Sequence, residues 1–306
     1  YFLPARPQAE HERLCQRKRF ENYKQQPLEF VFDKSFTGKL SQFGLDPNRR
    51  TPSGIKAAII REKGTNGERE MAYMLYLAGF DVKDVTMTDL ISGRETLEDI
   101  NMVVYCGGFS NSDVLGSAKG WAGSFLFNPK AKAALDNFYA REDTLSLGVC
   151  NGCQLMMELG LITPEDKKKG KMLHNDSHKF ESNFLGVTVP MNRSVMFGSL
   201  SGSKLGIWVA HGEGKFSLPY PEDHYNVVLK YSYDEYPGNP NGSDYSVAGI
   251  ASQDGRHLAM MPHLERACFP WENAYYPLDR KEEDQITPWM EAFVNARKWV
   301  EANRKK

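Results

Sequence analysis

The segment from Gly148 to Leu155, Gly-Val-Cys-Asn-Gly-Cys-Gln-Leu, constrains the fold more than any other part of the chain. It follows a short apolar run and leads into residues that favour a helix, so it predicts a strand, a tight turn and a helix. Cys150 stands between glycines two residues before and two residues after it, the pattern of a nucleophile elbow. Such a turn is so sharp that a Cβ at Gly148 or Gly152 would meet neighbouring backbone.

This geometry predicts a reactive cysteine. Cys150 would lie at a helix N-terminus, whose partial positive charge favours the thiolate, the form that attacks. The amide of Asn151 would point at the same place and form half of an oxyanion hole. Cys150-x-x-Cys153 is also the spacing of a redox pair or of half a zinc site, so these alternatives stay open. A zinc site usually needs a second close pair of ligands, and the remaining cysteines are isolated: Cys15, Cys106 and Cys268.

Composition excludes several classes of protein. The 306 residues are 41% hydrophobic and 25% charged, as in ordinary globular proteins, and the net charge of −1 gives no sign of nucleic acid or an anionic membrane as partner. No apolar run approaches the roughly 18 residues of a membrane span, and no signal peptide is evident. Five cysteines make no disulfide framework, so we expect a reducing, cytoplasmic compartment. The first residue is Tyr1 and not Met, so we expect a piece of a longer protein.

The chain divides near residue 52. Residues 1–52 are expected to be the tail of a preceding region and a linker: residues 10–24 are highly charged and predict either a solvated helix or a disordered arm, and 45–52 are rich in Pro and Asn. Residues 53–306 form the main domain. Its first half alternates predicted strands (55–60, 82–87, 100–105, 145–149) with predicted helices (68–77, 130–139). This alternation predicts a parallel sheet covered on both faces. The second half predicts further strands and one closing helix: 185–190, 205–209, 225–231, 247–251, 258–261 and 288–304.

A cysteine nucleophile needs a base, and His263 has the most favourable context of the seven histidines. It follows a predicted strand, as Cys150 does, so both would lie at the same edge of the sheet. Glu265 is two residues further on, and in extended chain such residues point the same way. Its carboxylate would accept the imidazole Nδ1–H, fix the tautomer and stabilise the imidazolium.

Two glycine-containing loops are candidates for binding the substrate. Gly107 and Gly108 follow a predicted strand and would let backbone amides approach a ligand, although a plain tight turn is equally compatible. His211, Gly212 and Glu213 also follow a strand and would suit a small zwitterion; a second catalytic histidine or a simple hairpin are the alternatives. The sequence predicts no metal site.

The motifs together resemble the class I (triad) glutamine amidotransferase family. The match rests on Cys150 in its elbow and His263-Leu264-Glu265, with three further segments in the same order: 107–116, 210–215 and 236–243. The resemblance implies a flavodoxin-like, three-layer α/β sandwich with a central, mostly parallel sheet. It implies Cys150 as nucleophile, His263 as general acid and base and Glu265 as its orienter. Gly108 and Asn151 would supply oxyanion amides, and Gln154 with the 211–213 loop would hold glutamine.

The resemblance also implies partners. The substrate would be L-glutamine, and the ammonia would pass to a synthetase domain of the same polypeptide, which binds ATP and magnesium; no cofactor is expected in this chain, which has no P-loop. The motifs are most similar to members that serve purine biosynthesis. Leu264 replaces a common proline, and Asn111-Ser112 replace a common Tyr-Gly pair. A γ-glutamyl peptide hydrolase, a thiol sensor or a docking domain with a latent triad remain alternatives.

Overall fold

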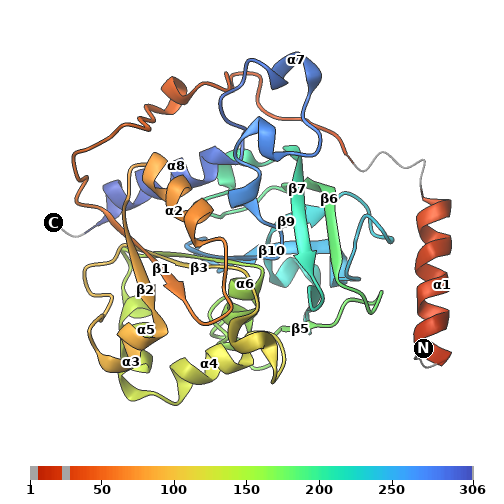
Figure 1. Ribbon diagram of the computed structural model, residues 1–306, viewed down its shortest axis with the longest axis horizontal. Coiled ribbons are helices and arrows are strands. Elements are labelled where there is room, and N and C mark those ends of the chain that lie inside the picture. The colour runs from red at the N-terminus through yellow and green to blue at the C-terminus, as the bar shows by residue number, and fades with distance from the viewer. Residues whose placement is uncertain (1–5, 23–27, 305–306) are drawn as a thin grey trace.

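The computed structural model describes residues 6–22 and 28–304, and its centre is a nine-stranded sheet (Figure 1). The strand order is β2-β1-β3-β4-β11-β10-β9-β6-β7. The strands in chain order are β1 (Lys56–Arg61), β2 (Asp81–Thr86), β3 (Met102–Tyr105), β4 (Leu145–Val149), β6 (Glu181–Thr188), β7 (Lys204–His211), β9 (Asn226–Tyr231), β10 (Val247–Ala251) and β11 (His257–Met260). A separate antiparallel pair joins β5 (Lys171–Leu173) to β8 (Lys215–Ser217).

The sheet is parallel in one half and antiparallel in the other. Parallel pairing joins β2, β1, β3, β4 and β11, whereas β10, β9, β6 and β7 continue the sheet by antiparallel pairing. Every residue of β3 and β4 is buried: β3 is a continuous apolar run, and β4 has only the small residues Ser146 and Gly148 between its large apolar ones. The carboxyl ends of β3 and β4 therefore meet at one edge, where the predicted site residues follow them.

Helices cover both faces of the sheet, which confirms the predicted α/β sandwich (Figure 1). α2 (Glu68–Leu77) packs on β1 and β2 and touches α8 (Met290–Asn303). The other layer contains α3 (Met87–Ser92), α4 (Lys119–Leu126), α5 (Pro129–Ala140) and α6 (Asn151–Glu158). α2 is amphipathic: Met71, Met74 and Leu75 are buried and lie three to four residues apart. None of the described helices is long and apolar enough to cross a membrane.

Most predicted elements are present, with some wrong boundaries. The helix at 68–77 and the strands at 145–149 and 247–251 were predicted with the observed ends. The strand predicted at 82–87 ends one residue early because the Thr86 and Asp89 side chains form a capping box that begins α3. Neither α3 nor α4 was predicted. The strand predicted at 185–190 is longer at its start and begins at Glu181.

The first fifty residues are partly attached to the domain core. α1 (Arg6–Glu21) lies on the side of the molecule where β6 and β7 complete the sheet, as Figure 1 shows, and Asn22 donates to the Tyr236 carbonyl at 2.8 Å. α1 confirms the helix alternative for 10–24 as far as Glu21; residue 22 is a turn, and residues 23 and 24 lie outside the described residues. Phe36 is buried in the main core, and the rings of Phe32 and Phe43 pack around it.

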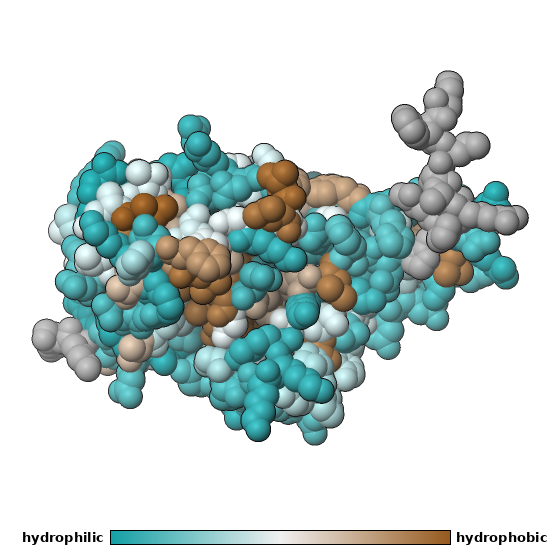
Figure 2. All heavy atoms as spheres, turned by 90° about the horizontal axis from the view of Figure 1, so that it is seen from below, coloured by the Kyte–Doolittle hydropathy of each residue, from teal (hydrophilic) through white to brown (hydrophobic). Residues whose placement is uncertain are grey.

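Viewed from the side of α4 and β5, the surface is mostly hydrophilic, with hydrophobic groups gathered near its middle (Figure 2). The segments that lead into and out of α4 expose several large apolar side chains, among them Val114, Leu115 and Phe127.

Candidate active site

Cys150 lies at the turn between β4 and α6 and has the strained backbone of a nucleophile elbow. Its φ and ψ are 52° and −107°, a conformation that non-glycine residues rarely adopt. A Cβ at Gly148 would lie 2.5 Å from the Gly152 carbonyl oxygen, and a Cβ at Gly152 would lie 2.0 Å from that of Tyr105. The predicted reason for both glycines is therefore confirmed. The Cys150 amide donates to the Met260 carbonyl at 2.9 Å, which ties the turn to β11.

His263 and Glu265 meet next to Cys150. The His263 Nδ1 and Glu265 Oε1 atoms are 2.7 Å apart, and both side chains are almost completely buried. The extended-chain argument for this pair was wrong, because Glu265 lies in a single 3-10 turn, Leu264–Arg266, that follows His263. The turn still brings the carboxylate to the ring. The His263 amide donates to the Trp208 carbonyl at 2.9 Å, so β7 holds the segment in place.

The electrostatic surroundings keep His263 protonated. Burial alone lowers the pKa of His263, but the charge of Glu265 and the hydrogen bonds with Cys150 and Glu265 outweigh it and raise the pKa to about 10. At neutral pH the ring is therefore an imidazolium next to the cysteine sulfur. A Cβ on Gly107 would lie 2.8 Å from the His263 Cε1 atom and 3.3 Å from the Cys150 Cβ, so only glycine fits between them.

Two backbone amides near the nucleophile, one on the cavity lining and one directly after Cys150, have no acceptor among the described residues. Within residues 6–22 and 28–304, neither the Gly108 N–H nor the Asn151 N–H donates to a protein atom. Asn151 is the first residue of α6, where amides have no intrahelical acceptor. Gly108 is held by the neighbouring loop: the Asn66 amide donates to Gly107 and the Phe109 amide to Gly64. Both N–H groups are thus available to a ligand oxygen.

Polar contacts link the elbow to the two predicted substrate loops. The Asn151 side chain accepts from the Ser110 amide at 2.9 Å and donates to Gln154 Oε1 at 2.9 Å. Gln154 in turn donates to the Glu213 carbonyl at 2.8 Å. Asp113, a residue that the sequence analysis did not select, accepts from Asn151 at 3.2 Å, and burial together with the charge of Glu213 raises the pKa of its carboxyl.

The side chain of His211 points into the protein interior, so only the backbone of this loop can serve the predicted binding of a small zwitterion. Its ring is fully buried, and neither ring nitrogen has a hydrogen-bond partner among the described residues. Burial lowers the pKa of His211 to about 4, so the ring is neutral at physiological pH. The backbone of the segment is what approaches the site: the Ala210 carbonyl lies 3.4 Å from the Cys150 sulfur, and Gly212 accepts from the Asn175 amide.

The cavity at the nucleophile is small, about 50 Å³. Besides Cys150 and His263 it is lined by Asn66, Gly108, Phe109, Phe180, Ala210 and Arg266. Phe109 and Phe180 are each half exposed, and their ring centroids are 5.9 Å apart. Sequence reasoning missed Asn66, Phe180 and Arg266, whereas Phe109 lies in the predicted loop after Gly107 and Gly108. Only Arg266 carried a usable signal, its place beside Glu265.

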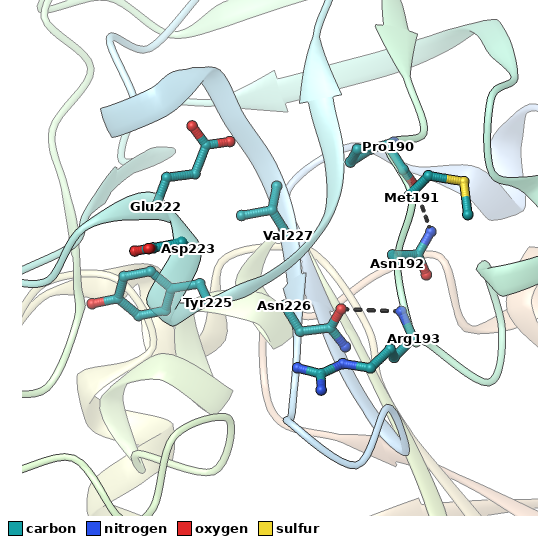
Figure 3. Close-up of a pocket in the computed structure, with 9 residues that line it drawn as sticks. All are labelled: Pro190, Met191, Asn192, Arg193, Glu222, Asp223, Tyr225, Asn226 and Val227. Atoms are coloured by element: carbon teal, nitrogen blue, oxygen red, sulfur yellow. Dashed lines mark hydrogen bonds between the residues drawn. The ribbon is translucent and has the colours of Figure 1, made fainter.

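A much larger cavity lies elsewhere. A cavity of about 620 Å³ lies between the segment after β6 and the start of β9 (Figure 3). In it the Arg193 amide donates to the Asn226 side chain at 3.2 Å, and Asn192 donates to the Pro190 carbonyl at 2.9 Å. None of its nine lining residues is a predicted site residue, so cavity size does not locate the chemistry in this fold.

Ser112 is expected to be a strained position. Asn111, Ser112 and Asp113 all have positive φ, and Ser112 has φ 57° and ψ 17°. This conformation costs an L residue about 1–2 kcal/mol, whereas glycine adopts it freely but loses about 0.5–1 kcal/mol of chain entropy. We expect Ser112→Gly to raise the free energy of unfolding by up to about 1 kcal/mol, measured by urea denaturation. Ser124→Gly, inside α4, is the control and should lower it; equal losses in both variants would contradict the argument.

Glu272 should make stability depend on pH. Burial, together with the charges of Glu265 and Glu70, raises the pKa of Glu272 to about 7 from a usual 4.5. Between these values the folded state binds more protons than the unfolded state, so stability falls as pH rises through this window. Glu272→Gln cannot lose a proton, so its Tm should drop less between pH 5 and pH 8 than that of the wild type. Equal decreases in the Tm of the wild type and of Glu272→Gln would contradict this prediction. Glu158→Gln is the control and should behave as the wild type does.

Fold and site together define a class: α/β proteins in which a cysteine at a nucleophile elbow meets a buried His–Glu pair. The chain matches the model of the CobB/CobQ-like glutamine amidotransferase domain over residues 54–300. It therefore belongs to this family.

Two curated relatives show the similarity in sequence. The probable phosphoribosylformylglycinamidine synthase, chloroplastic/mitochondrial, of Arabidopsis thaliana is 44% identical over 266 residues, which cover 81% of this chain and 19% of the relative. The phosphoribosylformylglycinamidine synthase of Homo sapiens is 44% identical over 281 residues, 82% of this chain and 21% of the relative. The chain thus spans about a fifth of the length of these relatives.

Solved structures agree on the fold. The structure of PurLQS from Thermotoga maritima superposes with a TM-score of 0.59 at 28% identity, covering 80% of this chain and 99% of that chain. A protein of Thermoplasma acidophilum that is described as part of a GMP synthase shares the fold, with a TM-score of 0.52 and 16% identity. That match covers 83% of this chain and 96% of the other.

Proposed function

We propose that this chain is the glutaminase part of a phosphoribosylformylglycinamidine synthase. It hydrolyses L-glutamine and supplies ammonia for the ATP-dependent conversion of formylglycinamide ribonucleotide to the amidine in purine biosynthesis. The observation that carries the proposal is the meeting of the Cys150 elbow with the His263–Glu265 pair, whose atoms are 2.7 Å apart. The two relatives named phosphoribosylformylglycinamidine synthase support the choice of pathway.

In the first half of the reaction, the Cys150 thiolate attacks the side-chain carboxamide carbon of glutamine. The carbonyl oxygen becomes an oxyanion, which accepts from the Gly108 and Asn151 amides, the two N–H groups that no described protein atom uses. His263 then gives its proton to the nitrogen as the C–N bond breaks. Ammonia leaves, and the products at the site are a γ-glutamyl thioester and a neutral imidazole.

In the second half, His263 acts as a base. The neutral ring takes a proton from water, and the hydroxide attacks the thioester carbon. The C–S bond breaks, glutamate leaves, and the thiolate–imidazolium pair returns. Glu265 keeps Nδ1 protonated and turns Nε2 toward the reacting atoms in both halves, so it orients the base without itself transferring the proton.

The α-amino and α-carboxylate groups of glutamine lie between the two loops that Asn151 and Gln154 connect. Gln154 and the backbone of 211–213 hold this end of the substrate, and the acidic side chains of Asp113 and Glu213 favour its ammonium group. ATP and magnesium act in the synthetase part of the complete enzyme. We place the complete enzyme in the cytoplasm.

The test is labelling with a glutamine-like diazo-ketone electrophile, read by intact mass and peptide mapping with and without excess glutamine. A single adduct on Cys150 that glutamine blocks supports the proposal. An adduct on another residue, or labelling of Cys150 that glutamine leaves unchanged, would contradict it.

A further inference from the structure

Four aromatic rings form a row on the outside of the molecule. Tyr76 and Tyr73 of α2 are stacked with ring centroids 6.4 Å apart, and Tyr73 lies 6.0 Å from Phe269. Phe269 is stacked on Trp271 at 5.6 Å, with an interplanar angle of 9°. These four residues are called the aromatic face below. It joins one helix of the sandwich to the segment that follows the His263–Glu265 pair.

Two rings of the aromatic face are exposed, whereas Tyr76 and Phe269 are half-buried and Phe269 packs against the main core. Trp271 is 75% exposed and Tyr73 is 44% exposed, although each ring has apolar area that burial would stabilise. Single exposed apolar residues are ordinary, but a contiguous row is not. Tyrosine and tryptophan are also the residues that most often dominate the binding energy of protein interfaces. The face therefore has the composition of a contact surface that lacks its partner.

Two arginines add charge to this surface. Arg69 lies four residues before Tyr73 and seven before Tyr76, so it belongs to the same stripe of α2. A groove of about 550 Å³ separates this stripe from residues 49–52. Arg49 is already used, since it pairs with Asp81 at 3.0 Å. Arg50 and Arg69 have no carboxylate partner within the part of the chain that the structure describes.

These observations favour a partner with carboxylates over a second copy of this chain. A two-fold dimer built on this face would bring a second Arg50 and a second Arg69 into the same interface, and like charges that come close in an interface are unfavourable. A surface that offers Asp or Glu side chains around an apolar centre would satisfy both the rings and the guanidinium groups.

We propose that the aromatic face, with Arg50 and Arg69, is the docking surface for an acidic surface of the synthetase part of the same polypeptide. The inference rests on the proposed function, which requires an ammonia-consuming partner, and on the relatives' being about five times as long as this chain. Beyond the proposed function, the inference identifies the side of the domain that the partner covers and the side chains that contact it.

The first test places a photo-cross-linking benzophenone amino acid at position 271, and separately at 73, in the full-length polypeptide. We expect cross-links to peptides outside these 306 residues. The control position is Met191, which is 85% exposed and lies on the cavity of Figure 3. Cross-links between two copies of the polypeptide, absence of any cross-link, or equal cross-linking from position 191 would each overturn the proposal.

The second test reverses one charge in the same full-length protein. Arg69→Glu should lower glutamine-dependent amidation at least about fivefold relative to the wild type, since a charge pair in an interface is lost. Ammonia-dependent amidation and glutamine-blocked labelling of Cys150 should remain. Lys167→Glu, the same charge change on an exposed loop, is the matched control. Equal rates in the two variants would overturn the docking surface, whereas a wild type without Cys150 labelling would overturn the proposed function instead.

Discussion

Cys150→Ala and His263→Ala are each expected to lower the rate of glutamine hydrolysis by roughly 10³-fold to 10⁶-fold, and the double variant by little more. The physical reason is that the two side chains act as one unit. Without the sulfur no thioester forms, and without the imidazolium the leaving nitrogen receives no proton. Ammonia release by the full-length enzyme, measured at saturating glutamine, gives the comparison. Additive losses in the double variant would show that the two residues act independently.

The control for this prediction is Cys153→Ala. Cys153 is completely buried in α6, and burial raises the pKa of its thiol well above the usual value, so it stays protonated and unreactive. A redox pair would need both cysteines, whereas an elbow nucleophile needs only Cys150. We therefore expect Cys153→Ala to keep most of the activity. A loss of activity comparable with that of Cys150→Ala would support the redox interpretation instead.

Glu265→Ala should lower the activity less than Cys150→Ala or His263→Ala does, since the proposed role of Glu265 is to orient the base.

The sequence predicted the elements whose signals are local. β4, the elbow and α2 have continuous apolar runs, paired glycines or a helical stripe, and their positions needed no knowledge of the rest of the chain. α4 was missed because its sequence, Lys-Gly-Trp-Ala-Gly-Ser-Phe-Leu, contains two glycines and favours a loop by intrinsic propensity. Packing of Trp121 and Phe125 against Tyr105 overrides that preference.

The residues of the candidate site also fall into two groups, those with a local sequence signal and those that only the fold brings together. Cys150, His263 and Glu265 were found because each lies in a motif with its own spacing. Asn66, Phe180 and the Ala210 carbonyl come from three separate segments that only the folded sheet brings to the cavity. A backbone carbonyl leaves no trace in sequence, and a phenylalanine at a cavity mouth has the same pattern as one in a core. The wrong local geometry assumed for His263 and Glu265 did not change the residues selected, because a 3-10 turn also places them in contact.

Gly152→Ala is expected to be among the most destabilising glycine-to-alanine changes in this fold. The added Cβ would lie 2.0 Å from the Tyr105 carbonyl oxygen and 2.6 Å from its carbonyl carbon. Both are backbone atoms of β3, whose four residues are all buried and paired with β1 and β4, so no side chain can rotate away. Overpacking of cores costs about 1–3 kcal/mol where side chains adjust. Here we expect at least about 3 kcal/mol, since a central strand or α6 must move.

The matched control is Gly123→Ala, a glycine inside α4. A Cβ there would lie 3.7 Å from the Phe127 ring, an ordinary contact. Removing a glycine from a helix interior then favours folding by about 0.5–1 kcal/mol. Denaturant midpoints of the two variants should therefore move in opposite directions from the wild type, at unchanged m-values. A Gly152→Ala protein with the wild-type midpoint would show that the helix and the strand are further apart than described.

Any Gly152→Ala protein that does fold should also lose activity. Relief of the clash requires α6 to move away from β3. The first residue of α6 is Asn151, whose amide is the proposed oxyanion donor directly after Cys150. Misplacement by about 1 Å costs on the order of 10²-fold in rate. Stability and activity should thus fall together in Gly152→Ala, whereas Cys150→Ala should lose activity at nearly unchanged stability. Because one variant acts through the position of the helix and the other through the missing sulfur, comparing the two separates the role of the elbow from the role of the nucleophile.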